Sequence, residues 1–414
     1  MGPIRKKKKK MTRLDYLLAI AAIALSACSG DYSVDTRTIG GDEPVAIEFD
    51  AASNRAHTRA DMAGAAAATA LNNQFHVYGV KTVDGTDRTV YPNYVVEYDG
   101  TDGAGAANST DSNTRGWEYV GLNNYPNQTL HYWDYSASNF MFQAWSHSTG
   151  SATVNVTGKN TLTITATSAD ELAKVYVADL VDIDKTVTPA TGINVYGGIV
   201  TFTFRSMATR VRFGMYETIS GYTVSKMTFR SPNGLFATSN SNALLEGSFN
   251  GQDSSAGGTY NVTYDATTKK AVVVNTAAGI TARYYDFGTF SQDAIGINRS
   301  NPTWAGGTPI YQQVLPNEDH AGDMTLYVDF VLTAEDGSGD VIKVTGAHVT
   351  VPASKMIWHP NHAYTYLFRI TKDVNGTTGD EGTDPEKLYP ITFDAIVTEF
   401  DETTPPVVTE LKDP

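Results

Sequence analysis

The clearest pattern in this 414-residue chain is an alternation of apolar and polar residues with a period of two. Its longest instance starts at Met324, and its apolar members are Met324, Leu326, Val328, Phe330 and Leu332. Side chains of a β-strand point alternately to the two faces of a sheet, so this run predicts a strand with one face in a core. Residues 341–351 are the expected hairpin partner, across a turn at residues 335–340.

Many shorter runs share this pattern, whereas a helical period is almost absent. The expected strands are residues 75–80, 94–98, 117–119, 139–145, 154–156, 162–164, 175–177, 200–204, 211–215, 364–370 and 391–400. An alanine-rich stretch at 60–70, interrupted by Gly64, predicts a short helix, and Ser168–Glu171 matches a capping box. A Thr/Gly-rich stretch at residues 186–198 is the best candidate for a boundary between two domains. We therefore expect an all-β fold with two β-sandwich domains, residues 44–198 and 199–414.

The composition argues against nucleic acid as a partner and against disulfide or thiolate–metal bonds as a source of stability. Without the residues before Cys28, which include seven bases and one acid, the chain has 24 basic and 44 acidic residues, a net charge of −20. Such an acidic protein is repelled by nucleic acid. The chain has no cysteine after Cys28. Disulfides and thiolate metal sites are therefore excluded from the mature protein.

The first 27 residues have the features of an export signal. Lys6–Lys10 precede an apolar run, Leu14–Leu25, that is shorter than the about 20 residues needed to span a bilayer. The run ends in Leu25-Ser26-Ala27-Cys28, which resembles the lipobox of bacterial lipoproteins. We expect lipid attachment at Cys28, followed by a tether at residues 28–43. The alternative is an ordinary signal peptide with an incidental cysteine, and translation starts at either Met1 or Met11.

Several stretches, in this order along the chain, carry a family resemblance. They are Asn73–Val80, Tyr132–Ala137 leading into Phe140–Trp145, Phe202–Val211, Trp358–Tyr366 and Ile391–Phe393. Together they resemble the fimbrillin family, the pilins of type V pili in Bacteroidales. Ser206 stands where a histidine is usual in the family, a departure with no expected chemical cost. The resemblance extends over most of residues 25–400.

The resemblance implies two transthyretin-like β-sandwiches and a known assembly scheme. Fimbrillins are exported as lipoproteins to the outer membrane and the cell surface. An arginine-specific protease removes an N-terminal segment with its first strand, and a C-terminal strand of a neighbouring subunit fills the vacated groove. The resemblance thus implies other pilin subunits and this protease as partners.

The residues of the N-terminal segment suit this scheme. Val45, Ile47 and Phe49 share one face of a short strand, so they form three apolar plugs for a groove. Cleavage is expected between Arg59 and Ala60, with Arg55-Ala56 as the second choice and Arg37-Thr38 as the third. Removing the strand would leave an open groove and two unpaired sheet edges, which strand addition repairs.

The donor strand is expected within residues 391–411. Two alternating runs lie there, and they consist of Ile391, Phe393, Ala395 and Val397, and of Val407, Thr409 and Leu411. Residues 403–411 are favoured because a terminal tail moves without unfolding a core. The alternative is that both chain ends are ordinary edge strands of a monomer.

No sequence pattern indicates catalysis, a cofactor or a metal. His359 and His362 flank Pro360-Asn361 and are better explained by a turn than by a zinc site. The tryptophans, Trp117, Trp133, Trp145, Trp304 and Trp358, favour core positions over sugar stacking. We therefore expect a non-enzymatic pilin subunit that polymerises by strand exchange into surface fimbriae used in adhesion. Within the fimbria the first choice of role is a shaft subunit, followed by a tip subunit or a lipid-retaining anchor subunit. The alternative is a monomeric surface lipoprotein that binds glycans through exposed tryptophans.

Overall fold

The computed structural model describes residues 45–54, 61–100, 110–147, 149–187, 189, 193–229, 242–250, 258–275, 281–289, 295–296, 298–305, 311–316, 323–371, 377–378, 392–399 and 407–410. This part of the chain is almost entirely β-structure, as predicted. Its helices are short: α2 (Gly64–Ala70), α3 (Ala169–Leu172) and a single 3-10 turn, η1 (Ala353–Lys355). Within these residues, no helix combines the length and the apolar character needed to cross a membrane.

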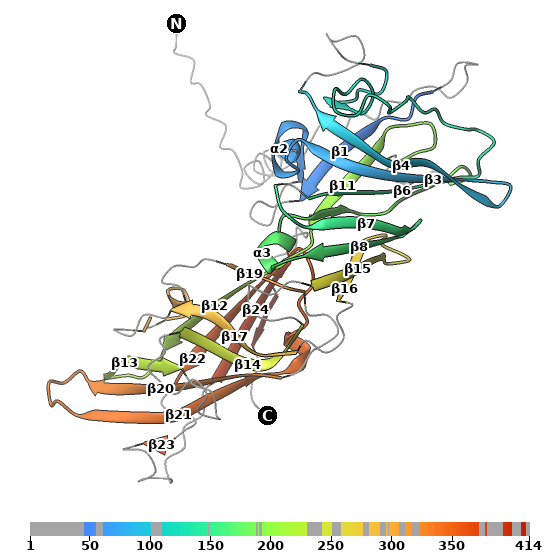
Figure 1. Cartoon of the computed structure of the whole chain (residues 1–414). Helices are drawn as coiled ribbons and strands as arrows, with labels where there is room; N and C mark the ends of the chain where they lie inside the picture. The colour runs from blue at the N-terminus through green and yellow to red at the C-terminus, as the bar shows by residue number, and fades with distance from the viewer. Residues whose placement is uncertain are drawn as a thin grey trace, which may run out of the picture.

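The largest sheet has nine strands and lies at the upper end of the elongated molecule in Figure 1. Its order is β2-β1-β11-β9-β6-β3-β4-β5, and β10 also pairs with β6. The strands are β1 (Phe49–Asn54), β2 (Asp61–Ala63), β3 (Gln74–Val83), β4 (Thr86–Tyr98), β5 (Trp117–Glu118), β6 (Asn139–Ser146), β9 (Tyr176–Ala178), β10 (Val181–Asp184) and β11 (Val200–Ser206). Strand β1 runs parallel to β11 and antiparallel to β2.

This sheet curls on itself. Strand β1 lies near one end of the strand order and β4 near the other, yet the ring centroids of Phe49 on β1 and Tyr91 on β4 are 5.0 Å apart. The enclosed cluster consists of apolar side chains that alternate along the strands, among them Phe75, Phe142, Phe202 and Phe204. The two ends of the sheet therefore share one aromatic core.

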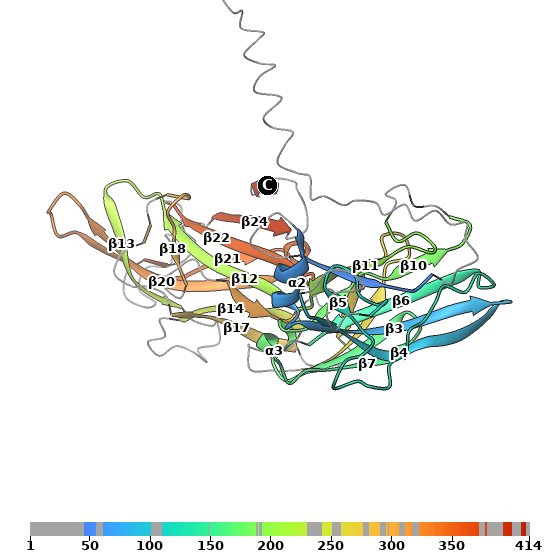
Figure 2. The ribbon, with the colours of Figure 1, turned by 90° about the horizontal axis from the view of Figure 1, so that it is seen from above.

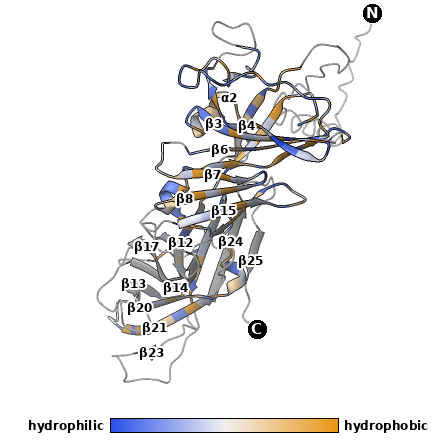
Figure 3. Cartoon of the chain, turned by 45° about the vertical axis from the view of Figure 1, so that its right-hand side comes forward, coloured by the Kyte–Doolittle hydropathy of each residue, from blue (hydrophilic) through white to orange (hydrophobic). Residues whose placement is uncertain are grey.

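A four-stranded sheet packs on the opposite face of β6. Its strands are β7 (Thr153–Gly158), β8 (Thr161–Ala166), β15 (Gly258–Tyr264) and β16 (Ala271–Asn275), in the order β16-β15-β8-β7. Trp145 of β6 shares a cluster with Leu162, Ile164, Tyr260 and Val262, whereas its neighbour Ala144 belongs to the aromatic core. Figure 3 shows apolar and polar residues interspersed along β7 and β8. Strands on both sides of the expected boundary at residue 198 thus share this sheet.

Two six-stranded sheets form the lower end in Figure 1 and are seen from above in Figure 2. One contains β12 (Thr209–Glu217), β18 (Thr303–Trp304), β19 (Gln312–Val314), β22 (His362–Ile370), β24 (Thr392–Glu399) and β25 (Val407–Glu410). The other contains β13 (Tyr222–Phe229), β14 (Asn242–Asn250), β17 (Thr281–Thr289), β20 (Met324–Ala334), β21 (Val341–Val351) and β23 (Thr377–Thr378). Phe213, Met215, Leu326, Val328, Phe330 and Phe368 are among the residues of the core between them.

The structure confirms the main sequence predictions of local structure. The five alternating apolar residues of β20, from Met324 to Leu332, are buried, and β20 pairs antiparallel with β21. The backbone N–H of Glu171 donates to Ser168 Oγ at 3.1 Å, which is the predicted N-cap. The alanine-rich helix begins at Gly64 itself, whose φ of 56° a residue with a side chain rarely adopts. Strand β11, expected to open the second domain, pairs with β1 and β9.

Candidate functional site

Residues Val45–Asn54, here called the N-terminal segment, lie in the aromatic core of the nine-stranded sheet. The side chains of Ile47, Phe49 and Ala51 are all fully buried, and Val45 packs against the same cluster. This is the face on which the sequence places Val45, Ile47 and Phe49. The segment extends five residues beyond the predicted Val45–Phe49, because β1 continues to Asn54.

Main-chain hydrogen bonds hold this segment on both sides. The N–H of Ile47 donates to His131 O at 2.8 Å, and the N–H of Trp133 donates to Val45 O at 3.0 Å. On the other side the N–H of Val200 donates to Glu48 O at 2.9 Å, and β1 then follows β11 from Phe49 to Ser53. We call the position between β11 and the strip His131–Trp133, continued by β2, the strand slot.

Phe49 is the central side chain in the slot. Its ring centroid lies 5.0 Å from Tyr91, 5.5 Å from Tyr119, and 5.7 Å from both Phe142 and Phe202. Such aromatic contacts stabilise a fold by more than the burial of their apolar area alone. The four rings come from β4, the segment after β5, β6 and β11, so Phe49 connects elements from both ends of the curled sheet.

A buried tyrosine binds the backbone of the segment. Tyr119 donates its hydroxyl proton to Ile47 O at 2.9 Å, and the N–H of His131 donates to the same hydroxyl at 3.3 Å. Burial raises the pKa of Tyr119 to about 12, so the hydroxyl keeps its proton at neutral pH. One hydroxyl thus bridges the N-terminal segment and the strip beside it.

Replacing Tyr119 by phenylalanine is expected to lower the free energy of unfolding by about 1 kcal/mol, because Ile47 O loses its side-chain donor. Urea denaturation of the full chain measures this change. Tyr135→Phe is the matched control, since Tyr135 is 40% exposed. An equal effect of the two substitutions would contradict the role of Tyr119.

An ion pair holds the segment at a second point. Arg115 Nη1 lies 2.6 Å from Asp50 Oδ2, and the Asp50 side chain is only 3% exposed. Arg115 and Gly116 form a two-residue hairpin turn with φ values of 51° and 86°, closed by hydrogen bonds between Thr114 and Trp117. This turn type favours asparagine or glycine at both positions. Arginine is unfavourable there, and its long side chain supplies the charge that Asp50 needs.

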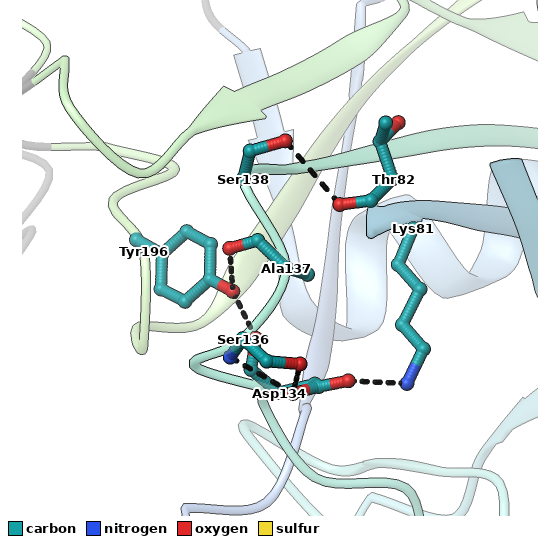
Figure 4. A network of polar contacts seen from close by, with 7 residues as sticks. All are labelled: Lys81, Thr82, Asp134, Ser136, Ala137, Ser138 and Tyr196. Carbon is teal, nitrogen blue, oxygen red and sulfur yellow. Dashed lines mark hydrogen bonds and ion pairs between the residues drawn. The ribbon is translucent and has the colours of Figure 1, made fainter. Parts of the chain in front are cut away.

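The residues that directly follow the strip are held by the polar network in Figure 4. Lys81 Nζ lies 2.6 Å from Asp134 Oδ2, while the N–H and the hydroxyl of Ser136 donate to Asp134 Oδ1 at 2.9 and 2.6 Å. The Tyr196 hydroxyl donates to Asp134 O at 2.5 Å, and the N–H of Ser138 donates to Thr82 O at 2.9 Å. These bonds anchor residues 134–138, which directly follow the strip.

Replacing Asp134 by asparagine is expected to destabilise the chain by about 1 kcal/mol at pH 7, a value kept small by partial exposure. Lys81, followed by Ser136, lowers the pKa of Asp134 to about 2. Its stabilising effect is therefore present above the ordinary pKa of 3.8 and is lost as the pH falls towards 2.

Denaturation of both proteins between pH 7 and pH 2 tests this, because the difference between them should disappear at the acid end. Asp336→Asn is the control, since the N–H of Ser338 donates to the Asp336 carboxylate in a similar turn at 2.9 Å. A difference between wild type and Asp134→Asn that does not change with pH would contradict the assignment.

Several predicted site residues lie outside the described part of the chain. These are Cys28, Arg55, Ala56, Arg59, Ala60, Ile391 and Leu411. The expected cleavage positions connect β1 to β2, whose ends pair as Asn54 with Asp61. Of the donor candidates, Phe393 and Val397 lie on β24, and Val407 and Thr409 lie on β25. Strand β24 pairs with β22 on one side and with β25 on the other.

The two histidines and five tryptophans considered as candidate site residues lie at a turn and in buried or partly buried positions. His359 and His362 flank a turn in which Asn361 has a φ of 61°, and His362 Nδ1 lies 2.8 Å from Pro360 O. Four tryptophans are buried: Trp117, Trp133, Trp145 and Trp358. The fifth, Trp304, is partly buried, with the Arg212 guanidinium 4.5 Å from its ring centroid.

Sequence reasoning missed Tyr119 and Arg115. Arg115 is separated from Asp50 by 65 positions, and no periodicity links two residues so far apart. The available signal was an arginine before Gly116, between a polar loop and a strand, where a tight turn favours other residues.

Comparison with known proteins gave results only among solved structures. No protein-family model and no curated protein matches the chain. The chain is similar to a fimbrial protein from Bacteroides vulgatus ATCC 8482, with 13% identity, coverage of 81% of this chain and 99% of the other, and a TM-score of 0.45.

Two structures from Parabacteroides distasonis ATCC 8503 are also similar. One is described as a proposed cell adhesion protein, with 10% identity, 87% and 98% coverage of this chain and of that one, and a TM-score of 0.40. The other is a fimbrial assembly protein, with 8% identity, 89% and 100% coverage, and a TM-score of 0.31.

Proposed function

We propose that this protein is a fimbrial subunit of the bacterial cell surface, and that its N-terminal segment is a placeholder strand. A protease cuts between β1 and β2, the segment leaves the strand slot, and a strand of another subunit enters. The observation that carries the proposal is the position of the segment. It fills the aromatic core as a strand, and residues 55–60 alone link it covalently to the part of the chain that follows.

The contacts of the segment explain why an empty slot would bind another strand favourably. Loss of Ile47 and Phe49 removes about 1.5–3 kcal/mol of apolar burial for each side chain. It also leaves β11 and the strip His131–Trp133 without their shared partner. An apolar groove beside unpaired strand edges is a template for strand addition.

The expected cleavage positions agree with this topology. A cut after Arg59 or Arg55 separates β1 from β2, while β2 stays attached to α2. The released part would then be held only by the lipid on Cys28 and by its contacts in the slot. In this proposal, the lipid retains the uncut precursor at the outer membrane, and cleavage frees the subunit for assembly.

The N-terminus of protein purified from surface filaments tests this proposal. Mass analysis is expected to find Ala60, or Ala56, as the first residue. The double substitution Arg55→Ala with Arg59→Ala should retain Cys28 and form no filaments, and Arg37→Ala is the matched control that should assemble normally. Filaments in which every subunit retains Cys28 would refute the trimming step.

A further inference from the structure

Two distant segments of this chain carry nearly the same five residues. Ile47–Ala51 reads Ile-Glu-Phe-Asp-Ala, and Ile391–Ala395 reads Ile-Thr-Phe-Asp-Ala. The first lies in the strand slot, and four of the second, residues 392–395, lie on β24. The dipeptide Phe-Asp occurs at only one other place in the sequence, Phe400-Asp401.

The four residues that agree include the three fully buried apolar side chains of the N-terminal segment and its ion-paired acid. Ile47, Phe49 and Ala51 are fully buried in the aromatic core. Asp50 forms the ion pair with Arg115 at 2.6 Å. The residue that differs, Glu48, shares its face of the strand with Asp50 and is 5% exposed.

We propose that the slot accepts residues Ile391–Ala395 of a second copy of this chain, in the register that puts Phe393 in the place of Phe49. Asp394 then takes the place of Asp50 and pairs with Arg115. This proposal rests on the strand exchange proposed above and adds the donor and its register to it.

Arg115 is the residue that fixes this register. A shift by one position moves every side chain to the other face of a strand. A shift by two positions keeps the face but places Thr392 or Ile396 opposite the guanidinium instead of an acid. The slot therefore selects a strand in which an acid directly follows the aromatic plug.

Other registers of the C-terminal region fit less well. With Val407 in the place of Ile47, Glu410 reaches Arg115, but Thr409 enters the four-ring site of Phe49 and Leu411 replaces a buried alanine. With Phe400 in the place of Phe49, Glu402 replaces the buried Ala51. Loss of a buried phenylalanine alone weakens binding by about a hundredfold.

Donation requires β24 to leave its own sheet. There it pairs with β22 from Thr392 to Glu399 and with β25 along its other edge. Ease of movement favours residues 403–411 as the donor, because a tail moves at lower cost, whereas the side chains that fit the slot favour residues 391–395. Exchange through β24 is consequently expected to be slow and to need an empty slot.

Labelled peptides measure which segment the slot accepts. The full chain is cut between residues 54 and 61 with an arginine-specific protease, and peptide binding is followed by fluorescence anisotropy. The reference peptide is residues 44–54, and the test peptides are residues 388–398 and 404–414. A variant of the first test peptide carries Asp394→Arg.

The proposal predicts that peptides 44–54 and 388–398 bind with affinities within about tenfold of each other, and that 404–414 binds about a hundredfold more weakly. The Asp394→Arg peptide should bind the slot at least about tenfold more weakly than the unmodified peptide. Arg115→Glu in the protein should restore the affinity of this variant peptide. Peptide 388–398 should also bind an Arg115→Ala chain more weakly than the wild-type chain, and this comparison keeps the test valid if Arg115→Glu fails to fold.

Two results would overturn the proposal while leaving strand exchange intact. In the first result, the slot binds peptide 44–54 but does not bind peptide 388–398. In the second, it binds peptide 404–414 more tightly than peptide 388–398. An Asp394→Arg peptide that binds as well as the unmodified one would overturn the role of Arg115. Failure of 44–54 itself to bind would overturn the proposed function and this inference together.

Discussion

Phe49→Ala is expected to lower the free energy of unfolding of the full-length chain by about 3–5 kcal/mol, because the substitution leaves a cavity between four aromatic rings. The ring of Phe49 is fully buried and contacts Tyr91, Tyr119, Phe142 and Phe202. Thermal or urea denaturation of the uncut protein measures the loss. In filaments the same substitution should have no effect, since the residue has been removed with the segment.

Phe368→Ala is the matched control for this prediction. Phe368 is equally buried, but it lies on β22 in the core between the two six-stranded sheets. Its loss should therefore weaken both the uncut chain and the filament. A filament that Phe49→Ala destabilises as much as it does the uncut chain would show that the N-terminal segment stays in its slot.

A reversible disulfide across the slot is expected to abolish assembly. Ala46 and Tyr132 are bridge partners flanked by the hydrogen bonds of Ile47 with His131 and of Trp133 with Val45. They form a non-hydrogen-bonded antiparallel pair, in which Cα atoms lie about 4.5 Å apart, and this is within the range that a disulfide bridges. Ala46→Cys with Tyr132→Cys should therefore tie the segment to the strip.

The oxidised double variant should be cut by the protease yet form no filaments, and a reductant should restore assembly to the level of the parent protein. Each single cysteine variant is the control for the substitutions themselves. Tyr132 is 45% exposed, so its replacement removes little buried surface. Filaments formed equally well by the oxidised and reduced protein would mean that release of the segment is not needed.

The strand pattern of this fold follows from the sequence because it depends on local alternation. The strict period of two in Met324–Leu332 predicts β20, and the capping residues at Ser168 and Glu171 predict α3. The same rule places Ile47 and Phe49 on one buried face. These features need only the identity of residues a few positions apart.

Contacts between distant segments do not follow from such local rules. The pairing of β15 with β8 joins residues 258–262 to residues 162–166, and the Arg115–Asp50 ion pair joins a turn to the N-terminal segment. Alternation shows that each strand has an apolar face but does not show which strand lies beside it. The position of Tyr119 beside Ile47 likewise depends on the curl of the nine-stranded sheet.

A density map of assembled filaments is the most direct test of strand replacement. The account predicts that the slot between β11 and the strip His131–Trp133 is filled by a strand whose chain continues into a neighbouring subunit. No density should connect this strand to Asp61 of the subunit that holds it. Filaments in which residues 45–54 of the same chain still occupy the slot would contradict the account.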